Sequence, residues 1–309
     1  MAPLAGGVSS DIWRIDLGGR RLCLKRALPR LKTAQLWEAP VARNRFEWDW
    51  YKVVASFCPE AVPPLVAQDA AAGLFVMEYL EPAEFPLWKD QLRLGQADVA
   101  TARAVGARLA LIHARTADDA ALAEHFRTDE SFYAIRLEPY LVATARAHPE
   151  LKRPLETLVA VTAGTRRALV HGDVSPKNIL VGSQGPIFLD AECAWYGDPA
   201  FDIAFCLNHL LLKCLWVAEA ADAFLRCFDD LAESYFAGVD WEEATALEAR
   251  VARLLPGLFL ARVDGKSPVE YVTAEADKDR VRRVAAHLLT DPATRLEVIR
   301  QAWRREISA

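Results

Sequence analysis

The sequence has no excess of basic residues, no paired cysteine motif and no uninterrupted apolar run long enough to cross a bilayer. Its 37 lysines and arginines are outnumbered by 42 aspartates and glutamates, which argues against nucleic-acid binding through broad phosphate neutralisation. Its six cysteines show neither a C-x-x-C pair nor zinc-ligand spacing, so we interpret them as buried thiols in a reducing compartment.

Two further absences concern membranes and export. The most apolar stretch, residues 205–224, is interrupted by polar and charged side chains and is typical of a core helix rather than a membrane span. The N-terminal residues lack the charged start and the apolar core of a signal peptide. We therefore expect a cytoplasmic protein that binds neither membrane nor nucleic acid; the sequence leaves its oligomeric state open.

The 309 residues are many for one hydrophobic core, so two lobes are expected. The first quarter is rich in β-type residues, and Gly18-Gly19 separates two apolar runs as a hairpin turn does. A helical pattern follows over residues 43–57 and a buried-strand pattern over residues 73–80. The linker after residue 80 marks the predicted boundary between residues 1–80 and residues 81–309.

The second unit is predicted to be mostly helical from about residue 98 onward. Two short strands are expected within it, "NILV" and "PIFLD", joined by residues 182–185 into a small hairpin. The sequence "SPVE", Ser267 to Glu270, has the pattern of a capping box and predicts that a helix begins there. No internal repeat or low-complexity segment is present.

Polar residues interrupt two apolar runs in "LVHGDVSPKNILV", where His171, Asp173 and Asn178 stand as H-x-D-x-x-x-x-N. Asp190 closes the next predicted strand, twelve positions beyond Asn178. Phosphoryl transfer from a nucleotide needs one carboxylate beside the acceptor hydroxyl, and an amide oxygen with a second carboxylate to hold Mg²⁺. The alternative is an Asp/Asn-rich turn with only local hydrogen bonds.

The first unit contributes candidates of its own. The loop "AGGVSSD", with Gly6, Gly7 and Ser9, precedes a strand, as expected of a backbone that approaches phosphates; the alternative is an N-terminal tail. Lys25 on the following strand is placed to contact phosphates, and Glu47 on the next helix is placed to pair with it. Alternatively, each of these two residues is an ordinary charged residue exposed to solvent. The order of the glycine-containing loop, the lysine, the glutamate and the H-x-D-x-x-x-x-N motif along the chain favours a kinase-type site.

At this point the chain resembles the aminoglycoside phosphotransferase/choline kinase superfamily of small-molecule kinases. The stretches that carry the resemblance are "GGVSS", "CLK", "HGDVSPKNIL", "IFLDAE" and "WYGDPAFDIAF", from about residue 5 to residue 210. The resemblance implies an α+β fold like that of protein kinases, with a small β-rich nucleotide-binding lobe at residues 1–80. It also implies a larger helical lobe at residues 81–309, holding the catalytic hairpin and the acceptor site.

Carried over position by position, the resemblance assigns a role to each matching residue. Asp173 becomes the catalytic base, while Asn178 and Asp190 become the ligands of Mg²⁺. Lys25 becomes the lysine that binds the ATP phosphates, with Glu47 as its partner. The hinge whose backbone meets adenine is then formed by Glu78, Tyr79 and Leu80.

Two departures from protein kinases refine this match. The metal-binding aspartate is followed by Ala191 and Glu192, a D-x-E pattern similar to that of choline kinases and methylthioribose kinases. Glu192 is therefore a further candidate metal ligand, with a salt bridge or a solvated loop position as the alternative. Only eleven residues separate Asp190 from Asp202, which leaves no room for a peptide-binding platform. A small acceptor is expected.

Three residues around the catalytic loop are expected to support it. His171 is interpreted as a brace that holds the loop by backbone hydrogen bonds. Asp202 is predicted either to cap the apolar helix that follows it or to tie down the loop. Lys177 is a candidate contact for the γ-phosphate, with a solvated lysine as the alternative.

The acceptor site is the least specified part of the sequence. Arg262, Asp264 and Lys266 are close together in "LFLARVDGKSPVEYV" and are candidates for binding a polar or anionic acceptor; an ordinary charged turn is the alternative. Trp195 is the first of several aromatic residues that could instead cage a quaternary ammonium, or simply form core, the others being Tyr196, Trp216, Tyr235 and Trp241.

The sequence thus predicts an ATP- and Mg²⁺-dependent phosphotransferase that acts on a hydroxyl of a small polar metabolite, such as a sugar or an amino alcohol. One alternative is a kinase that inactivates cationic aminoglycosides, although the mixed charges of "ARVDGK" do not favour it. The alternative from another class is a nucleotide-binding pseudokinase that regulates a partner. Asp173, Asn178, Asp190 and Lys25 are all present, which favours the enzyme.

Overall fold

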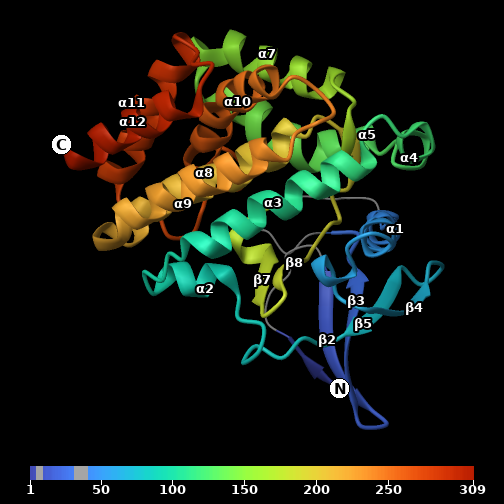
Figure 1. Ribbon diagram of the computed structural model, residues 1–309. Helices are drawn as coiled ribbons and strands as arrows, with labels where there is room; N and C mark the ends of the chain where they lie inside the picture. Colours follow the sequence, from blue (N-terminus) through green and yellow to red (C-terminus); the bar gives the residue numbers. More distant parts are fainter. Residues whose placement is uncertain (5–9, 31–40) are drawn as a thin grey trace.

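The computed structural model describes residues 1–4, 10–30 and 41–309. A five-stranded antiparallel sheet with the order β1-β2-β3-β5-β4 occupies one end of the molecule (Figure 1). Its strands are β1 (Ala2–Pro3), β2 (Ser10–Leu17), β3 (Arg20–Ala27), β4 (Leu65–Asp69) and β5 (Leu74–Glu78). The predicted turn at Gly18-Gly19 is confirmed: β2 pairs with β3 up to Leu17 and Arg20, and both glycines have positive φ, 59° and 81°.

Helix α1 (Arg43–Ala55) packs against this sheet and confirms the helical pattern predicted there. Trp50, Tyr51 and Val54 recur three and four positions apart and are completely buried. Phe75 of β5 lies against this helix, with its ring 6.1 Å from that of Tyr51. The packing fixes which α1 side chains point toward the rest of the molecule.

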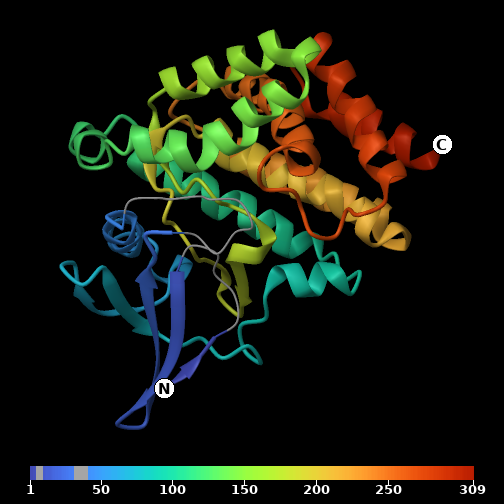
Figure 2. The same cartoon turned by 180° about the vertical axis from the view of Figure 1, so that it is seen from behind.

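The remainder of the chain is mainly helical, and its helices form a separate layer on the other side of the small hairpins (Figures 1 and 2). These helices are α2 (Trp88–Arg93), α3 (Val99–Thr116), α4 (Ala120–His125), α5 (Asp129–Phe132), the π-helical segment η2 (Tyr133–Val142), α6 (Ala143–Ala147), α7 (Lys152–Gly164), α8 (Ala200–Trp216), α9 (Ala221–Ala237), α10 (Ala244–Asp264), α11 (Glu275–Thr290) and α12 (Leu296–Ser308). The described residues also contain four 3₁₀ turns, of which η3 (Pro149–Leu151) and η5 (Ala218–Ala220) connect helices of this layer, whereas η1 (Pro59–Ala61) follows α1 and η4 (Pro176–Asn178) precedes a short strand.

Helix α8 is the centre of this layer. Fifteen of its 17 residues are buried, from Ala200 to Cys214, because α9 and α10 cover it on two sides. In the described ranges, no helix combines the length and apolarity that crossing a bilayer requires. The six cysteines are buried free thiols, as predicted.

The helical part contains four short strands, whereas only two were predicted. The predicted hairpin is confirmed as β7 (Ile179–Gly182) and β8 (Gly185–Phe188), which lies between the sheet and the helices in both views (Figures 1 and 2). The additional pair is β6 (Ala168–Val170) with β9 (Trp195–Gly197). Each has only three residues, and periodicity cannot distinguish so short a buried strand from a buried helical segment.

The helix predicted to begin at Ser267 is wrong. The chain is non-helical there, and α11 begins only at Glu275. The Ser267 hydroxyl and carbonyl oxygens accept hydrogen bonds from Arg262, and the backbone N–H of Val269 donates to the Arg262 carbonyl at 2.9 Å. The serine thus accepts hydrogen bonds from the last turn of α10 and does not cap a following helix.

Candidate active site

The polar loop follows β6 directly and ends in the turn η4. Gly172 has φ 78°, and a Cβ atom there would lie 2.7 Å from both Cβ and the carbonyl oxygen of Cys193. A residue with a side chain is therefore excluded sterically and disfavoured by its backbone conformation. This glycine allows the loop to turn tightly against the segment after β8.

His171 braces the loop through both ring nitrogens. Its Nε2 donates to the carbonyl oxygen of Leu189 at 3.0 Å, and its Nδ1 accepts from the backbone N–H of Asp173 at 3.1 Å. This pattern corresponds to the neutral imidazole. Burial lowers the pKa of His171 below its usual value, despite the opposing effect of Asp202. The histidine thus links the catalytic loop to the segment that follows β8 and contains Asp190.

Asp202 ties the same loop to α8. Its two carboxylate oxygens accept from the backbone N–H groups of His171 and Gly172, both at 2.7 Å. Because α8 already begins at Ala200 and has no side-chain cap, the loop contact rather than the capping contact is present. His113 lies 3.3 Å from the same carboxylate and 2.9 Å from the hydroxyl of Tyr235, so it belongs to this buried network.

Asp173 is 3% exposed and lies between two cations. Its Oδ2 is 2.9 Å from Arg136 and 3.1 Å from Lys177. Burial acts to raise the pKa of Asp173, but the charges of Arg136 and Lys177 outweigh it, and the pKa lies below its usual value. The carboxylate is therefore ionised and available as a hydrogen-bond acceptor.

Arg136 is a site residue that the sequence reasoning missed. It projects from η2 and is 6% exposed, and its remaining N–H groups donate to the carbonyl oxygens of Gly172 and Ile135. The available signal was an arginine among the mostly apolar residues of "YAIRLEPYLV", in which Glu138 is the other charged residue. A charged residue in such a run is seldom fully buried unless it has a partner.

Lys25, Glu47 and Asp190 come together as a buried charge cluster. The Nζ of Lys25 lies 2.7 Å from Glu47 and also pairs with the carboxylate of Asp190. Burial opposes the charge on Lys25, but Asp190 and Glu47 raise its pKa above the usual value. Tyr51, which the sequence reasoning missed, donates to Glu47 at 2.9 Å and accepts from the Asp190 backbone N–H at 2.8 Å.

The candidate metal ligands flank the β7–β8 hairpin in the sequence: Asn178 directly precedes β7, and Asp190 follows β8, so both lie at its open end. The side-chain N–H of Asn178 donates to the Asp173 carbonyl oxygen at 3.0 Å, which leaves its amide oxygen as a donor to a cation. Asp190 has φ 67°, a strained conformation for a residue with a side chain. Among the described residues there is no group of three or more histidine, cysteine or carboxylate ligands for a metal.

This donor set fits Mg²⁺ and not a closed structural site. One carboxylate and one amide oxygen are hard ligands, and Mg²⁺ typically takes one or two protein oxygens together with substrate phosphates and water. The third candidate, Glu192, forms a salt bridge of 2.9 Å with Arg43, whose guanidinium also donates to the carbonyl oxygen of Leu28. Of the roles considered for Glu192, the salt bridge is therefore the one that the structure contains.

The remaining nucleotide-binding candidates are only partly described. Gly6, Gly7 and Ser9 lie outside the described residues. In the predicted hinge, the backbone N–H of Glu78 donates to Pro64 and that of Tyr79 donates to Arg21, at 2.9 and 3.0 Å. The Glu78 carboxylate pairs with Arg20. Of the three hinge residues, Leu80 is the one whose backbone N–H has no such protein acceptor in the described ranges.

The acceptor candidates do not form one site. Asp264 pairs with Arg282 at 2.7 Å and with His148 at 2.8 Å, and Lys266 pairs with Glu138 at 2.8 Å. Only Arg262 lines a pocket beside the catalytic loop, together with Lys177.

The aromatic candidates are also dispersed. Trp195 is buried, stacks on Phe132 with 4.2 Å between ring centroids, and donates to Asp129 at 2.9 Å. Tyr235 and Trp241 pack around His113, away from Trp195. Trp216 stacks on Tyr271, and the amine of Lys213 lies over both rings. The structure therefore has no single cage formed by these aromatic residues.

Comparison with known proteins gives a family match over most of the chain. Residues 1–235 match the model of the phosphotransferase enzyme family (APH). The methylthioribose kinase of Erwinia tasmaniensis is 28% identical over 329 aligned residues, which cover 92% of this chain and 81% of the relative. The methylthioribose kinase of Yersinia pseudotuberculosis is 25% identical, and the match spans 65% of this chain and about half, 55%, of the relative.

Solved structures share the fold. A choline/ethanolamine kinase family protein from Mesorhizobium loti superposes with a TM-score of 0.56 at 17% identity, covering 97% of this chain and 91% of the other. Amicoumacin kinase hAmiN, in complex with AMP-PNP, Ca²⁺ and Ami, gives a TM-score of 0.55 at 15% identity, covering 94% and 88%. The predicted α+β, protein-kinase-like fold is confirmed.

Proposed function

Because this chain belongs to the phosphotransferase enzyme family and is a small-molecule kinase, we propose that it transfers the γ-phosphate of ATP, with Mg²⁺, to a hydroxyl group of a small polar metabolite. The relatives named methylthioribose kinase favour a sugar-like acceptor within that class. The division into a nucleotide-binding lobe of residues 1–80 and an acceptor-binding lobe of residues 81–309 is part of this proposal.

The observation that carries the proposal is the ionised carboxylate of Asp173, held at 2.9 Å by Arg136 on a loop that also carries Asn178. In the proposed mechanism, Asp173 orients the acceptor hydroxyl for in-line attack and takes its proton late in the transfer. Lys25, fixed by Glu47, binds the phosphates.

Mg²⁺, held by Asn178 and Asp190, would neutralise charge on the phosphates. Asp190, which follows the β7–β8 hairpin, pairs with Lys25 of the sheet. Residues from both proposed lobes therefore meet in this ion pair. Lys177 pairs with Asp173, and we propose that it also contacts the transferred group. We give Glu192 no metal role, because Arg43 engages its carboxylate.

The direct test is Asp173→Asn, which keeps the side-chain size and removes the base. Phosphate transfer should fall by roughly 10²–10⁴-fold, while titration with AMP-PNP and Mg²⁺ should give nearly unchanged nucleotide binding. Asp240→Asn, at an exposed position, is the matched control and should keep full activity. Normal turnover by the Asp173 variant would refute the assignment.

Two other functions remain to be compared in the same assay. An aminoglycoside kinase should gather carboxylates around a polycationic acceptor, but the pocket beside the catalytic loop is lined by Lys89, Lys177, Lys213 and Arg262 against one acidic residue, Glu270. A pseudokinase would bind nucleotide without consuming it. Mg²⁺-dependent ATP consumption, measured with sugars, methylthioribose, choline, homoserine and aminoglycosides as acceptors, separates the three functions.

A further inference from the structure

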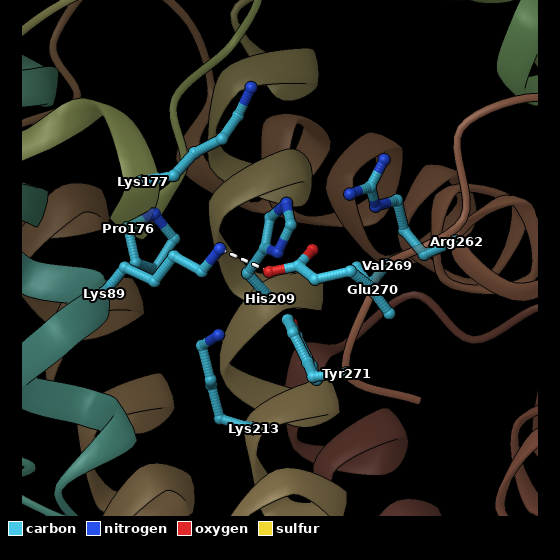
Figure 3. Close-up of a pocket in the computed structure, with 9 residues that line it drawn as sticks. All are labelled: Lys89, Pro176, Lys177, His209, Lys213, Arg262, Val269, Glu270 and Tyr271. Carbon is cyan, nitrogen blue, oxygen red and sulfur yellow. Dashed lines mark hydrogen bonds and ion pairs between the residues drawn. The ribbon is translucent and has the colours of Figure 1, made fainter. Parts of the chain in front are cut away.

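The pocket beside the catalytic loop brings together side chains from five parts of the chain, one of which is the segment 269–271 between α10 and α11 (Figure 3). Lys177 reaches it from η4, Lys89 from α2, Lys213 from α8 and Arg262 from α10. It encloses about 250 Å³ of space, its open mouth included. Lys177, which lines the pocket, also lies 3.1 Å from Asp173, the carboxylate proposed to receive the acceptor hydroxyl.

Of the basic residues that line this pocket, Lys89 pairs with Glu270 and Lys177 pairs with Asp173, whereas Arg262 and Lys213 have no acidic partner among the described residues. Of the lining residues that the structure describes, Glu270 is the only acidic one, and it pairs with Lys89 (Figure 3). Within the part of the chain that the structure describes, the Arg262 guanidinium donates only to neutral oxygens, those of the Tyr140 hydroxyl and of Ser267, and its buried Nε has no hydrogen-bond partner.

Lys213 is the most unusual member of this group. It is 1% exposed, and its amine lies 3.9 Å from the ring centroid of Trp216 and 3.8 Å from that of Tyr271. Across the described parts of the chain it has no hydrogen-bond or ion-pair partner. Burial, with the nearby charge of Lys89, lowers its pKa to about 6. The amine is therefore mostly uncharged near neutral pH until an anion approaches.

Two further polar groups of the lining lack partners. The Nε2 of His209 and the hydroxyl of Tyr271 are buried and make no hydrogen bond with any of the described residues. Most buried polar atoms in proteins are paired, so several unpaired groups around one space require an explanation. An arginine N–H, a tyrosine hydroxyl, a histidine nitrogen and a lysine amine can all donate to one acceptor-rich group.

Building on the phosphotransferase function proposed above, we propose that the acceptor carries an anionic group, a carboxylate or a phosphate, which binds in this pocket to Lys213, Arg262 and Tyr271. The anion accepts hydrogen bonds from groups that have no other partner, and Lys213 takes up a proton to complete the ion pair. The hydroxyl to be phosphorylated then lies toward Asp173, on the Lys177 side of the pocket. A neutral sugar satisfies fewer of these donors.

The test uses three compounds with one carbon skeleton: D-ribose, D-ribonate and D-ribose 5-phosphate. Binding is measured by calorimetry at pH 7.5 with AMP-PNP and Mg²⁺ present, in two buffers of different ionisation enthalpy. We expect at least one anion to bind about tenfold to hundredfold more tightly than ribose. Its binding should take up about one proton per site, whereas ribose should take up none. The two anions distinguish a carboxylate site from a phosphate site.

The proton uptake is assigned by replacing Lys213, because other titratable groups face the same pocket. The groups whose charges act on Lys213 are Lys89, Asp90, Arg262 and Glu270, with His209 one turn away on α8. Lys213→Met retains the long side chain between the two rings and removes the amine. In this variant both the preference for the anion and the proton uptake should disappear, while ribose binding stays unchanged.

Two further variants complete the design. Lys152→Met, at an exposed lysine of α7, should behave like the wild type. Tyr271→Phe removes a hydroxyl that has no partner among residues 1–4, 10–30 and 41–309, so the variant should fold normally and bind the anion about tenfold more weakly. The proposal is overturned if ribose binds as tightly as both anions, or if Lys213→Met weakens all three compounds equally. Binding is measured without turnover, so this failure is distinct from an absence of phosphate transfer.

Discussion

Replacement of Arg136 by methionine would leave the Asp173 carboxylate buried with Lys177 as its only cationic partner. Asp173 is 3% exposed and Arg136 is 6% exposed, so neither charge can be solvated in place of the other. The substitution also removes hydrogen bonds to the carbonyl oxygens of Gly172 and Ile135. The side-chain volume is roughly kept, so packing changes contribute little.

The expected loss follows from these contacts. Breaking one partner of a buried ion pair costs roughly 3–5 kcal/mol, because an uncompensated charge remains. Each lost backbone hydrogen bond adds about 1 kcal/mol. We therefore expect Arg136→Met to lower the free energy of unfolding by about 5–7 kcal/mol, a large part of the stability of a typical protein. Arg136→Met/Asp173→Asn should recover about 2–3 kcal/mol of this, since the isolated buried charge is gone.

Urea unfolding of the wild type, both single variants and the double variant gives the coupling energy. Tryptophan fluorescence and circular dichroism must report the same transition for this comparison to hold. Arg146→Met is the control, because Arg146 forms an exposed pair with Glu138 and should cost less than about 1 kcal/mol. If the losses of the two single variants simply add in the double variant, Arg136 does not compensate the charge of Asp173.

Three other variants test separate parts of the site. Tyr51→Phe removes a hydroxyl that forms hydrogen bonds with Glu47 and with the Asp190 backbone. It should lower the free energy of unfolding in urea by about 1–3 kcal/mol and should also reduce kcat. An unchanged kcat would exclude a positioning role for Tyr51. Gly172→Ala should destabilise more than Gly18→Ala when melting temperatures are compared, because both have positive φ but only Gly172 faces atoms at 2.7 Å. In Lys213→Met the free energy of unfolding should be higher than in the wild type at pH 7.5. Wild-type stability should rise with pH between about 6 and 10.5, because in this range Lys213 binds a proton in the unfolded chain but not in the folded chain. The free energy of unfolding of the variant should lack this dependence on pH.

The sequence determined those features that depend on neighbours along the chain. The hairpin at Gly18-Gly19, helix α1 and the β7–β8 hairpin follow from local turn chemistry and from hydrophobic periodicity, and each is present as predicted. The spacing of His171, Asp173 and Asn178, with Asp190 beyond, indicated phosphoryl transfer, and the family match supports a small-molecule phosphotransferase. The metal and nucleotide roles of these residues stay predictions.

Only the tertiary structure decided which charges meet. Arg136 is 37 positions before Asp173 and Arg43 is 149 positions before Glu192, and no local pattern encodes either contact. Arg262, Asp264 and Lys266 are neighbours in sequence, yet the end of α10 directs only Arg262 to the pocket beside the catalytic loop. Lys213 appears in the sequence as one polar residue in an apolar helix. Its burial, and its lack of an ion-pair partner among the described residues, depend on how α2, α8 and α10 pack, because electrostatic energies are set by distance and solvent exposure.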